Sequence, residues 1–146
     1  MRGFLYQTPP PCYAHKINHF SAFAVTKLDV LDKLKKVAIC HSYTILPPTP
    51  PGPSGDNHPE SGISSLNNST KCQTIDYFPA DAKILERCQP NYIWLDGWES
   101  DTTGIRDYEK LPENARKFIE KLEEILGVRV GWIGVGPDRE AIIVRD

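Results

Sequence analysis

The most regular hydrophobic pattern in the chain lies between residues 112 and 126, "PENARKFIEKLEEIL". Its apolar residues recur at the i, i+3, i+4, i+7 spacing of an amphipathic helix. They are Ala115, Phe118, Ile119, Leu122, Ile125 and Leu126. Pro112 suits the first turn of a helix, and Gly127 suits the position just after the last turn. The pattern therefore predicts a helix with one apolar face.

Shorter runs of apolar and β-branched residues predict strands. These runs occupy residues 20–25, 37–43, 72–78, 91–95, 128–133 and 141–144. A short helix is expected over residues 81–88, with Ile84, Leu85 and Cys88 on one face and Pro90 ending it. Strands that alternate with helices indicate an α/β fold. The strands are numerous for a small doubly wound domain, which indicates a portion of a larger sheet.

Two stretches have no packing pattern. Residues 1–12 include Pro9, Pro10 and Pro11 and are predicted to be a flexible, extended leader. Residues 47–70, "PPTPPGPSGDNHPESGISSLNNST", are mostly Pro, Gly, Ser and Asn and bury too little apolar surface to offset the entropy of ordering. The predicted organisation is thus a leader at 1–12 and one domain over 13–146, interrupted by a flexible Pro/Ser-rich loop at about 47–70.

Length and charge narrow the function classes. A chain of 146 residues suits one domain. Its net charge of -2 provides no field for nucleic acid or for an anionic membrane. No apolar run reaches the roughly 20 residues that span a bilayer, and the first residues lack the apolar core of a secretory signal. We therefore expect a cytoplasmic protein that binds neither nucleic acid nor membrane.

The four cysteines are scattered along the chain, at Cys12, Cys40, Cys72 and Cys88. No C-x-x-C pair occurs, and no histidine stands at zinc-ligand spacing, so we expect no metal site. A cysteine nucleophile paired with a histidine likewise has no supporting spacing. The pattern favours free, mostly buried thiols.

The stretch "TKLD", Thr26 to Asp29, follows a predicted strand and contains the residue types expected of a guanine-binding turn. One carboxylate can accept hydrogen bonds from both the ring N–H and the 2-amino group of guanine, and adenine presents neither donor in that arrangement. Lys27 can lay its aliphatic stem along the purine while its ammonium stays in water. Taken alone, Lys-x-Asp after a strand is more often an exposed turn.

A second candidate is "GVGPDR", Gly134 to Arg139. Its glycines can let the backbone approach a flat base or a phosphate. It is not a dinucleotide fingerprint, because no third glycine opens a helix at the required offset. An ordinary turn with Pro137 at its second position has the same composition, so the spacing alone leaves both interpretations open.

Longer segments resemble a known family. They are "YAHKINHFSAFAVTKLDVLD", "IDYFPAD", "GWESDTTGIRDYEKLPENARKFIEKLEEILGV" and "WIGVGPDRE". In this order they are similar to segments near the C-terminus of adenylosuccinate synthetase. The resemblance implies a GTP-dependent ligase of AMP biosynthesis, which joins IMP to L-aspartate with Mg²⁺ present and releases GDP and phosphate. It also implies a large, mostly parallel sheet flanked by helices, and a homodimer.

The resemblance assigns roles to six residues by position. Lys27, Leu28 and Asp29 match the family segment that holds the guanine base of GTP, with Asp29 as the specificity carboxylate. Gly134, Val135 and Gly136 match the second segment that lines this base.

The chain also departs from the family. The glycine-rich phosphate loop with its catalytic aspartate, the catalytic histidine, the Mg²⁺ ligands and the segments for IMP and aspartate have no counterpart, so no catalytic or metal residue is assigned. His19 replaces the glycine usual after the Ile-Asn pair. We therefore expect the C-terminal part of the enzyme, inactive alone. The alternative is a non-catalytic guanine-nucleotide or protein-interaction module derived from it, favoured by the Pro/Ser-rich insert.

Overall fold

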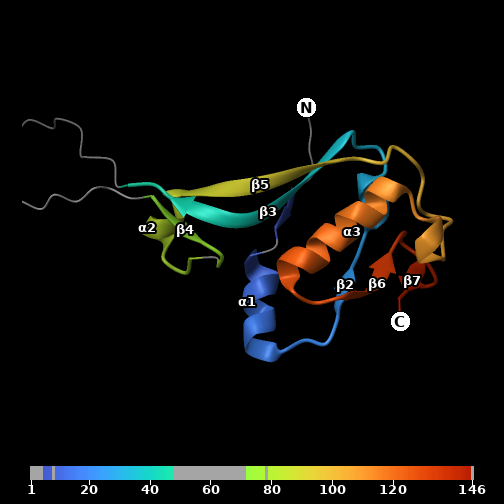
Figure 1. Ribbon diagram of the computed structural model, residues 1–146, viewed down its shortest axis with the longest axis horizontal. Coiled ribbons are helices and arrows are strands. Elements are labelled where there is room, and N and C mark those ends of the chain that lie inside the picture. Colours follow the sequence, from blue (N-terminus) through green and yellow to red (C-terminus); the bar gives the residue numbers. More distant parts are fainter. Residues whose placement is uncertain (1–4, 8, 48–71, 78, 146) are drawn as a thin grey trace, which may run out of the picture.

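Two β-sheets and one long helix packed against both make up the fold, seen in a computed structural model (Figure 1). The structure describes residues 5–7, 9–47, 72–77 and 79–145. The Pro/Ser-rich loop predicted at 47–70 lies almost wholly outside these residues, so its flexibility stays a prediction. The α/β class is confirmed, because helices flank sheets that contain parallel strands.

The first sheet is built around β3 (Lys36–Ile45). Strand β5 (Cys88–Asp96) pairs with it antiparallel from end to end. On the opposite edge of β3, β1 (Leu5–Gln7) pairs parallel with one half and β4 (Gln73–Ile75) antiparallel with the other. The long β3–β5 ribbon therefore reaches well beyond the helix at one end, where β4 lies (Figure 1).

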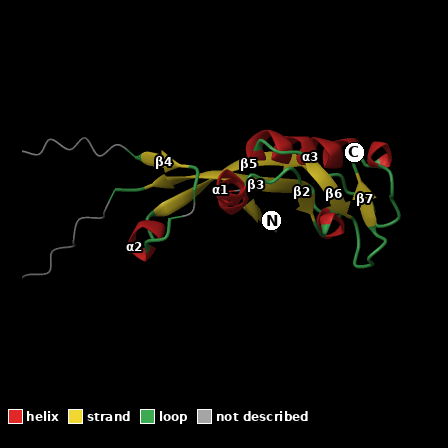
Figure 2. Cartoon of the chain, turned by 90° about the horizontal axis from the view of Figure 1, so that it is seen from below, coloured by secondary structure: helices red, strands yellow, loops and turns green. Residues whose placement is uncertain are grey.

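The second sheet carries the candidate site. Strand β2 (Phe23–Val25) runs parallel to β6 (Val130–Gly134), and β7 (Ile142–Val144) pairs antiparallel with β6 on its other side. Figure 2 shows helix α3 (Glu113–Leu126) on one side of these three strands. Because β2 and β6 are parallel, the segments that follow them leave the sheet at the same edge.

Helix α3 confirms the amphipathic prediction. Its buried residues are Ala115, Phe118, Ile119, Leu122 and Leu126. They share one hydrophobic cluster with Val37 and Ile39 of the first sheet and with Ile133 and Ile143 of the second. Gly127 ends the helix in the left-handed region at φ 68°, with its N–H donating to the Glu123 carbonyl at 2.8 Å. The helix therefore joins the two sheets.

The extended leader predicted for residues 1–12 is wrong where the structure describes it. Residues Leu5–Gln7 form β1, and α1 spans Pro9–Asn18. Prolines are tolerated in the first turn of a helix, where no backbone N–H has an intrahelical partner, so a Pro-rich start does not exclude a helix. The domain boundary after residue 12 stays a prediction.

The region between residues 72 and 96 also differs from the prediction. Helix α2 is one short turn (Ala82–Leu85), started by the Asp81 carboxylate, which accepts a hydrogen bond from the Lys83 N–H at 2.8 Å. Pro90 does not end a helix but lies within β5, opposite Tyr43. Since β5 has one partner strand among the described residues, it is an edge strand, where proline is tolerated.

The strands and cysteines need smaller corrections. The runs at 20–25 and 72–78 yield strands of three residues each, whereas the run at 37–43 lengthens to Lys36–Ile45. Cys40 is buried and Cys88 is partly buried, but Cys72 is exposed, so the expectation of mostly buried thiols is wrong for Cys72. The side chain of Cys12 is outside what the structure describes.

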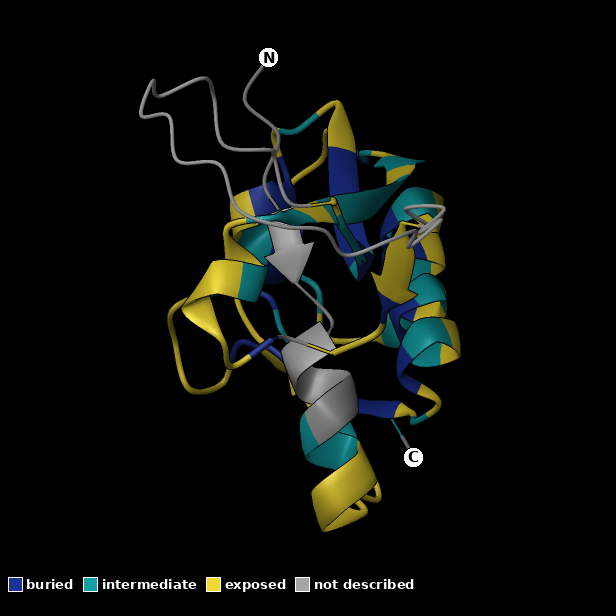
Figure 3. Cartoon of the chain, turned by 90° about the vertical axis from the view of Figure 1, so that its left-hand side faces the viewer, coloured by how far each residue is buried: buried dark blue, intermediate teal, exposed yellow. Residues whose placement is uncertain are grey.

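His19 occupies a position that favours glycine. It follows the last turn of α1, donates its N–H to the His15 carbonyl at 2.8 Å, and has φ 52°. The last turn of α1 is exposed (Figure 3), and so is His19. A non-glycine residue in the left-handed region costs roughly 1–2 kcal/mol, and an exposed side chain recovers little of it by packing.

We expect His19→Gly to raise the free energy of unfolding by about 1 kcal/mol, after the extra entropy of glycine in the unfolded chain is deducted. Urea-induced unfolding measures the change. Gly127→Ala is the matched control of opposite sign, because Gly127 has φ 68° and an added Cβ meets nothing within 4 Å. A loss of stability in His19→Gly would contradict this account.

A candidate purine pocket at the ends of two parallel strands

The first wall of the site begins where β2 ends. Lys27 has φ 60° and ψ 42°, and this left-handed residue turns the chain into the short 3₁₀ helix η1 (Leu28–Leu31). The hydrophobic effect orients this turn, because Leu28 and Leu31 are buried in the core. Asp29 and Val30 are consequently left on the outer side, where Asp29 is partly buried and Val30 exposed.

The second wall begins where β6 ends. Val25 is paired with Ile133, so the next residue of β6, Gly134, lies beside the end of β2. A Cβ added to Gly134 would be 3.4 Å from the Thr26 Cα and 3.6 Å from the Lys27 nitrogen. The two segments therefore lie so close that an added Cβ would already be in van der Waals contact with the Thr26–Lys27 backbone.

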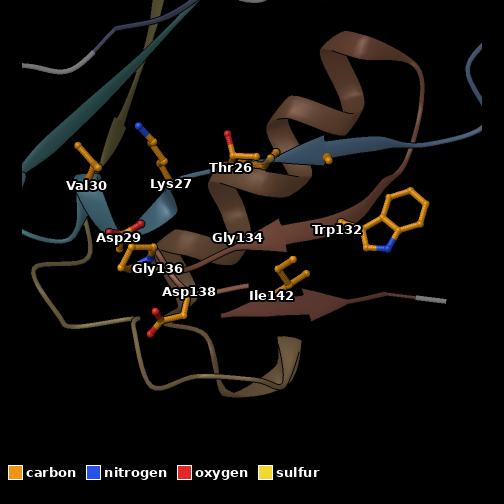
Figure 4. Close-up of a pocket in the computed structure, with 12 residues that line it drawn as sticks. Thr26, Lys27, Asp29, Val30, Trp132, Gly134, Gly136, Asp138 and Ile142 are labelled. Carbon is orange, nitrogen blue, oxygen red and sulfur yellow. The ribbon is translucent and has the colours of Figure 1, made fainter. Parts of the chain in front are cut away.

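The two walls enclose a cavity of about 400 Å³ (Figure 4). Its lining consists of residues from β2, η1, β6, β7 and the turn between β6 and β7: Ala24, Val25, Thr26, Lys27, Asp29, Val30, Trp132, Gly134, Gly136, Pro137, Asp138 and Ile142. Figure 4 shows Asp29 beside Gly136 at one end of the cavity and Trp132 at the other. A cavity of this size falls within the range of small-molecule sites.

Four of the six predicted site residues line this cavity: Lys27, Asp29, Gly134 and Gly136. The other two, Leu28 and Val135, are fully buried and belong to the hydrophobic core. Neither residue is part of the cavity lining, so both support its walls from within the core. The Val135 N–H donates to the Ala141 carbonyl at 2.8 Å, which closes the β6–β7 turn.

Asp29 carries an unused acceptor. Its Oδ1 atom is buried and has no hydrogen-bond partner within the described part of the chain. Buried polar atoms in proteins nearly always have a partner, so an exception calls for a ligand or water to complete it. The carboxylate thus presents an acceptor for N–H donors of a bound molecule.

Several lining residues were not predicted from the sequence, among them Trp132, Asp138 and Ile142. Strand alternation provides a signal for Trp132, since residues two apart lie on one face and Gly134 was already a candidate. Asp138 lies in the quoted "GVGPDR" stretch and adds a second carboxylate, which is exposed. Ile142 comes from β7, and its position depends on pairing that local spacing does not reveal.

Two other chemistries receive no support. Burial raises the pKa of the Cys40 thiol, which disfavours the nucleophilic thiolate. Among the described residues, no three His, Cys, Asp or Glu side chains are grouped so that they could hold a metal ion.

No helix in the part of the chain that the structure describes is both long and apolar enough to cross a membrane.

The fold and the pocket together define an α/β protein with a ligand-sized cavity at the edge where two parallel strands end, the usual position of ligand sites in open α/β sheets. The family model for adenylosuccinate synthetase matches residues 8–143. The chain belongs to the adenylosuccinate synthetase family.

Individual relatives agree with this assignment. The adenylosuccinate synthetase of Pyricularia oryzae is 38% identical over 133 residues, which are 91% of this chain and 26% of the relative. Adenylosuccinate synthetase 2, chloroplastic, of Sorghum bicolor is also 38% identical, over 91% of this chain and 22% of the relative. The structure of fully ligated adenylosuccinate synthetase from Plasmodium falciparum matches with a TM-score of 0.76 at 27% identity, over 97% of this chain and 28% of that one. The chain thus spans about a quarter of the length of these relatives.

Proposed function

We propose that the cavity between β2 and β6 binds the guanine base of a guanine nucleotide. The observation that carries this proposal is the buried, unpartnered Oδ1 of Asp29 at the edge of a cavity of suitable size. The 2-amino and ring N–H groups of guanine are adjacent donors that one carboxylate can engage together. Adenine offers a ring acceptor in place of the ring donor, which repels the carboxylate.

Lys27 and the glycines have supporting roles in this proposal. Lys27 is exposed at the mouth of the cavity, so its aliphatic stem can lie along the purine ring while its ammonium stays hydrated. Gly134 and Gly136 leave space for a flat ring beside the backbone. A Cβ added to Gly136 would be 3.1 Å from the Ala141 Cβ, so a side chain there would strain the turn.

For the whole protein, we propose the activity for which the relatives are named: GTP-dependent joining of IMP to L-aspartate, giving adenylosuccinate in AMP biosynthesis. The proposal includes GTP as co-substrate, Mg²⁺, a homodimer and a cytoplasmic location. Among the described residues, no group of His, Cys, Asp and Glu side chains could hold a metal ion, so we assign no Mg²⁺ ligand to this chain. What this chain contributes is recognition of the base.

The base-binding proposal is tested by comparing nucleotides on the purified chain. We expect GTP and GDP to bind with similar, weak affinity, because contacts to the base distinguish neither from the other. ADP and ATP should bind about a hundredfold more weakly, because both hydrogen bonds to the Asp29 carboxylate are lost. Ligand-observed NMR with competition gives these ratios. Equal binding of GDP and ADP would overturn the proposal.

A second expectation concerns catalysis: the chain alone should form no adenylosuccinate. Phosphoryl transfer depends on groups that position the phosphates and neutralise the developing charge, and this chain corresponds to about a quarter of its relatives. Assaying IMP, aspartate, GTP and Mg²⁺ with the purified chain checks this, and product above a no-protein control would contradict it. Binding of guanine nucleotides without product formation would agree both with the C-terminal part of the enzyme and with the alternative, a non-catalytic guanine-nucleotide module.

A further inference from the structure

A second aspartate lies on the same 3₁₀ turn as Asp29, at the position that ends it. Asp32 is 7% exposed, and its carboxylate accepts hydrogen bonds from three donor groups. The Trp98 Nε1–H donates to Oδ1 at 2.7 Å, the Thr102 N–H donates to Oδ2 at 2.7 Å, and the Thr102 hydroxyl lies 2.9 Å from Oδ1 and 3.1 Å from Oδ2. Hydrogen bonds to an ionised acceptor in a buried place are strong and directional.

The loop that supplies these donors is itself held firmly. An added Cβ at Gly97 would be 1.7 Å from the Leu34 carbonyl oxygen, so only glycine allows the loop to start so close to the end of η1. The Gly97 carbonyl accepts a hydrogen bond from Asn114 of α3 at 2.8 Å. Trp98 packs on Phe118 of the same helix, with ring centroids 6.0 Å apart. The donors to Asp32 are thus fixed relative to the core.

Asp32 is hydrogen-bonded to the backbone of Asp29 but does not line the cavity between β2 and β6, here called the base pocket. The Asp32 N–H donates to the Asp29 carbonyl at 3.2 Å, which closes the turn between them. Asp29 lines the base pocket and also a neighbouring cavity of about 590 Å³ that Asp32 and the Trp98–Thr102 loop help to form. Neither Asp32 nor Trp98 lines the base pocket. Any influence of Asp32 on a bound base is therefore indirect, through the turn that carries Asp29 and Val30.

We propose that Asp32, held by Trp98 and Thr102, is a positioning residue that fixes the Asp29 carboxylate for reading the 2-amino group of guanine. The inference rests on the proposed guanine site and adds a residue that determines its selectivity. Without the hydrogen bonds from Trp98 and Thr102 to Asp32, η1 would be held against the core by the buried side chains of Leu28 and Leu31. Such apolar contacts fix how deeply the turn is buried more strongly than how it is rotated. To accept both guanine donors at once, the two oxygens of the Asp29 carboxylate must be held in a fixed orientation. A turn that can rotate therefore weakens one of the two hydrogen bonds between Asp29 and the base.

The test compares GDP with IDP, which lacks the 2-amino group, on the whole chain. We expect the parent chain to favour GDP by about tenfold, the value of one hydrogen bond to a charged acceptor. Asp32→Asn should reduce this ratio by at least about fivefold, because its amide group places a donor against the Trp98 or Thr102 donors. The matched control is Asp101→Asn, which removes one aspartate charge from the loop that carries Trp98 and Thr102.

Asp101 is exposed, and its carboxylate accepts hydrogen bonds only from Thr103 among the described residues, at 2.9 Å from the N–H and 2.6 Å from the hydroxyl. These bonds hold the pKa of Asp101 below its ordinary value, but they do not reach η1. We expect the GDP-to-IDP ratio of Asp101→Asn to stay within about twofold of the parent. The pair of variants separates loss of charge from loss of the anchor.

The outcomes distinguish the two proposals. Equal binding of GDP and IDP by the parent chain would overturn the proposed guanine site. A parent that favours GDP, with the same ratio in Asp32→Asn at a lowered thermal midpoint, would show that Asp32 is merely structural. If Asp32→Asn does not fold, Trp98→Phe and Thr102→Val each remove one donor and leave the carboxylate. An unchanged ratio in both of these folded variants would likewise overturn the inference.

Discussion

Asp29→Asn is expected to abolish the preference of the chain for guanine nucleotides. In the parent, the carboxylate accepts from both the ring N–H and the 2-amino group, and a hydrogen bond to a charged acceptor is worth roughly 1.5–3 kcal/mol. Asparagine keeps one acceptor and places an N–H₂ group against the other donor, so attraction becomes repulsion. Together these losses amount to about 3 kcal/mol, or about a hundredfold in the ratio of GDP to ADP affinity.

Asp138→Asn is the control for this experiment. Asp138 lines the same cavity and carries the same charge, but it is exposed, whereas Asp29 has a buried oxygen without a partner. We expect Asp138→Asn to leave the GDP-to-ADP ratio within about twofold of the parent, since an exposed carboxylate is well solvated without a ligand. If instead Asp138→Asn loses the preference and Asp29→Asn keeps it, the reading carboxylate is Asp138 and the assignment of Asp29 is wrong.

The helix that carries the core could be predicted from the sequence because its signals are local. The apolar spacing of α3 and Gly127 at its end depend on neighbours within one or two turns. The structure places the predicted apolar face in the core and Gly127 at positive φ. Local signals give the wrong element where the structure depends on residues distant in the sequence. Pro90 predicts the end of a helix, but it lies in β5, an edge strand whose single partner among the described residues is β3.

The candidate site likewise combines features that local sequence predicts with features that depend on distant segments. Lys27 and Asp29 could be singled out because their chemistry suits guanine, and resemblance linked them to Gly134 and Gly136. The parallel pairing of β2 with β6 is what brings these segments together, and it leaves no trace in local spacing. The role of Asp32 could not be predicted from the sequence for a related reason. An aspartate three residues after Asp29 looks like a solvated turn residue, and its donors are 66 and 70 residues further along the chain.

The largest stability effect is expected at Phe118, where α3 meets both sheets. Phe118 is 1% exposed, packs on Trp98 with ring centroids 6.0 Å apart, and shares a hydrophobic cluster with residues of β2, β3 and β6. Truncating a buried phenylalanine to alanine removes its transfer free energy and leaves a cavity, at a cost of about 3–5 kcal/mol. We therefore expect Phe118→Ala to lower the free energy of unfolding by about 4 kcal/mol, a large share of the roughly 5–15 kcal/mol typical of a domain.

Urea-induced unfolding followed by circular dichroism measures this loss, and Glu120→Ala is the control on the same helix. Glu120 is exposed, so its truncation should change the free energy of unfolding by less than about 0.5 kcal/mol. Because Trp98 also donates to Asp32, Phe118→Ala should in addition loosen the loop that anchors η1. The GDP-to-IDP ratio should then fall in those Phe118→Ala molecules that remain folded. A loss below about 1 kcal/mol would mean that the two sheets hold together without this contact, and that α3 does not join them.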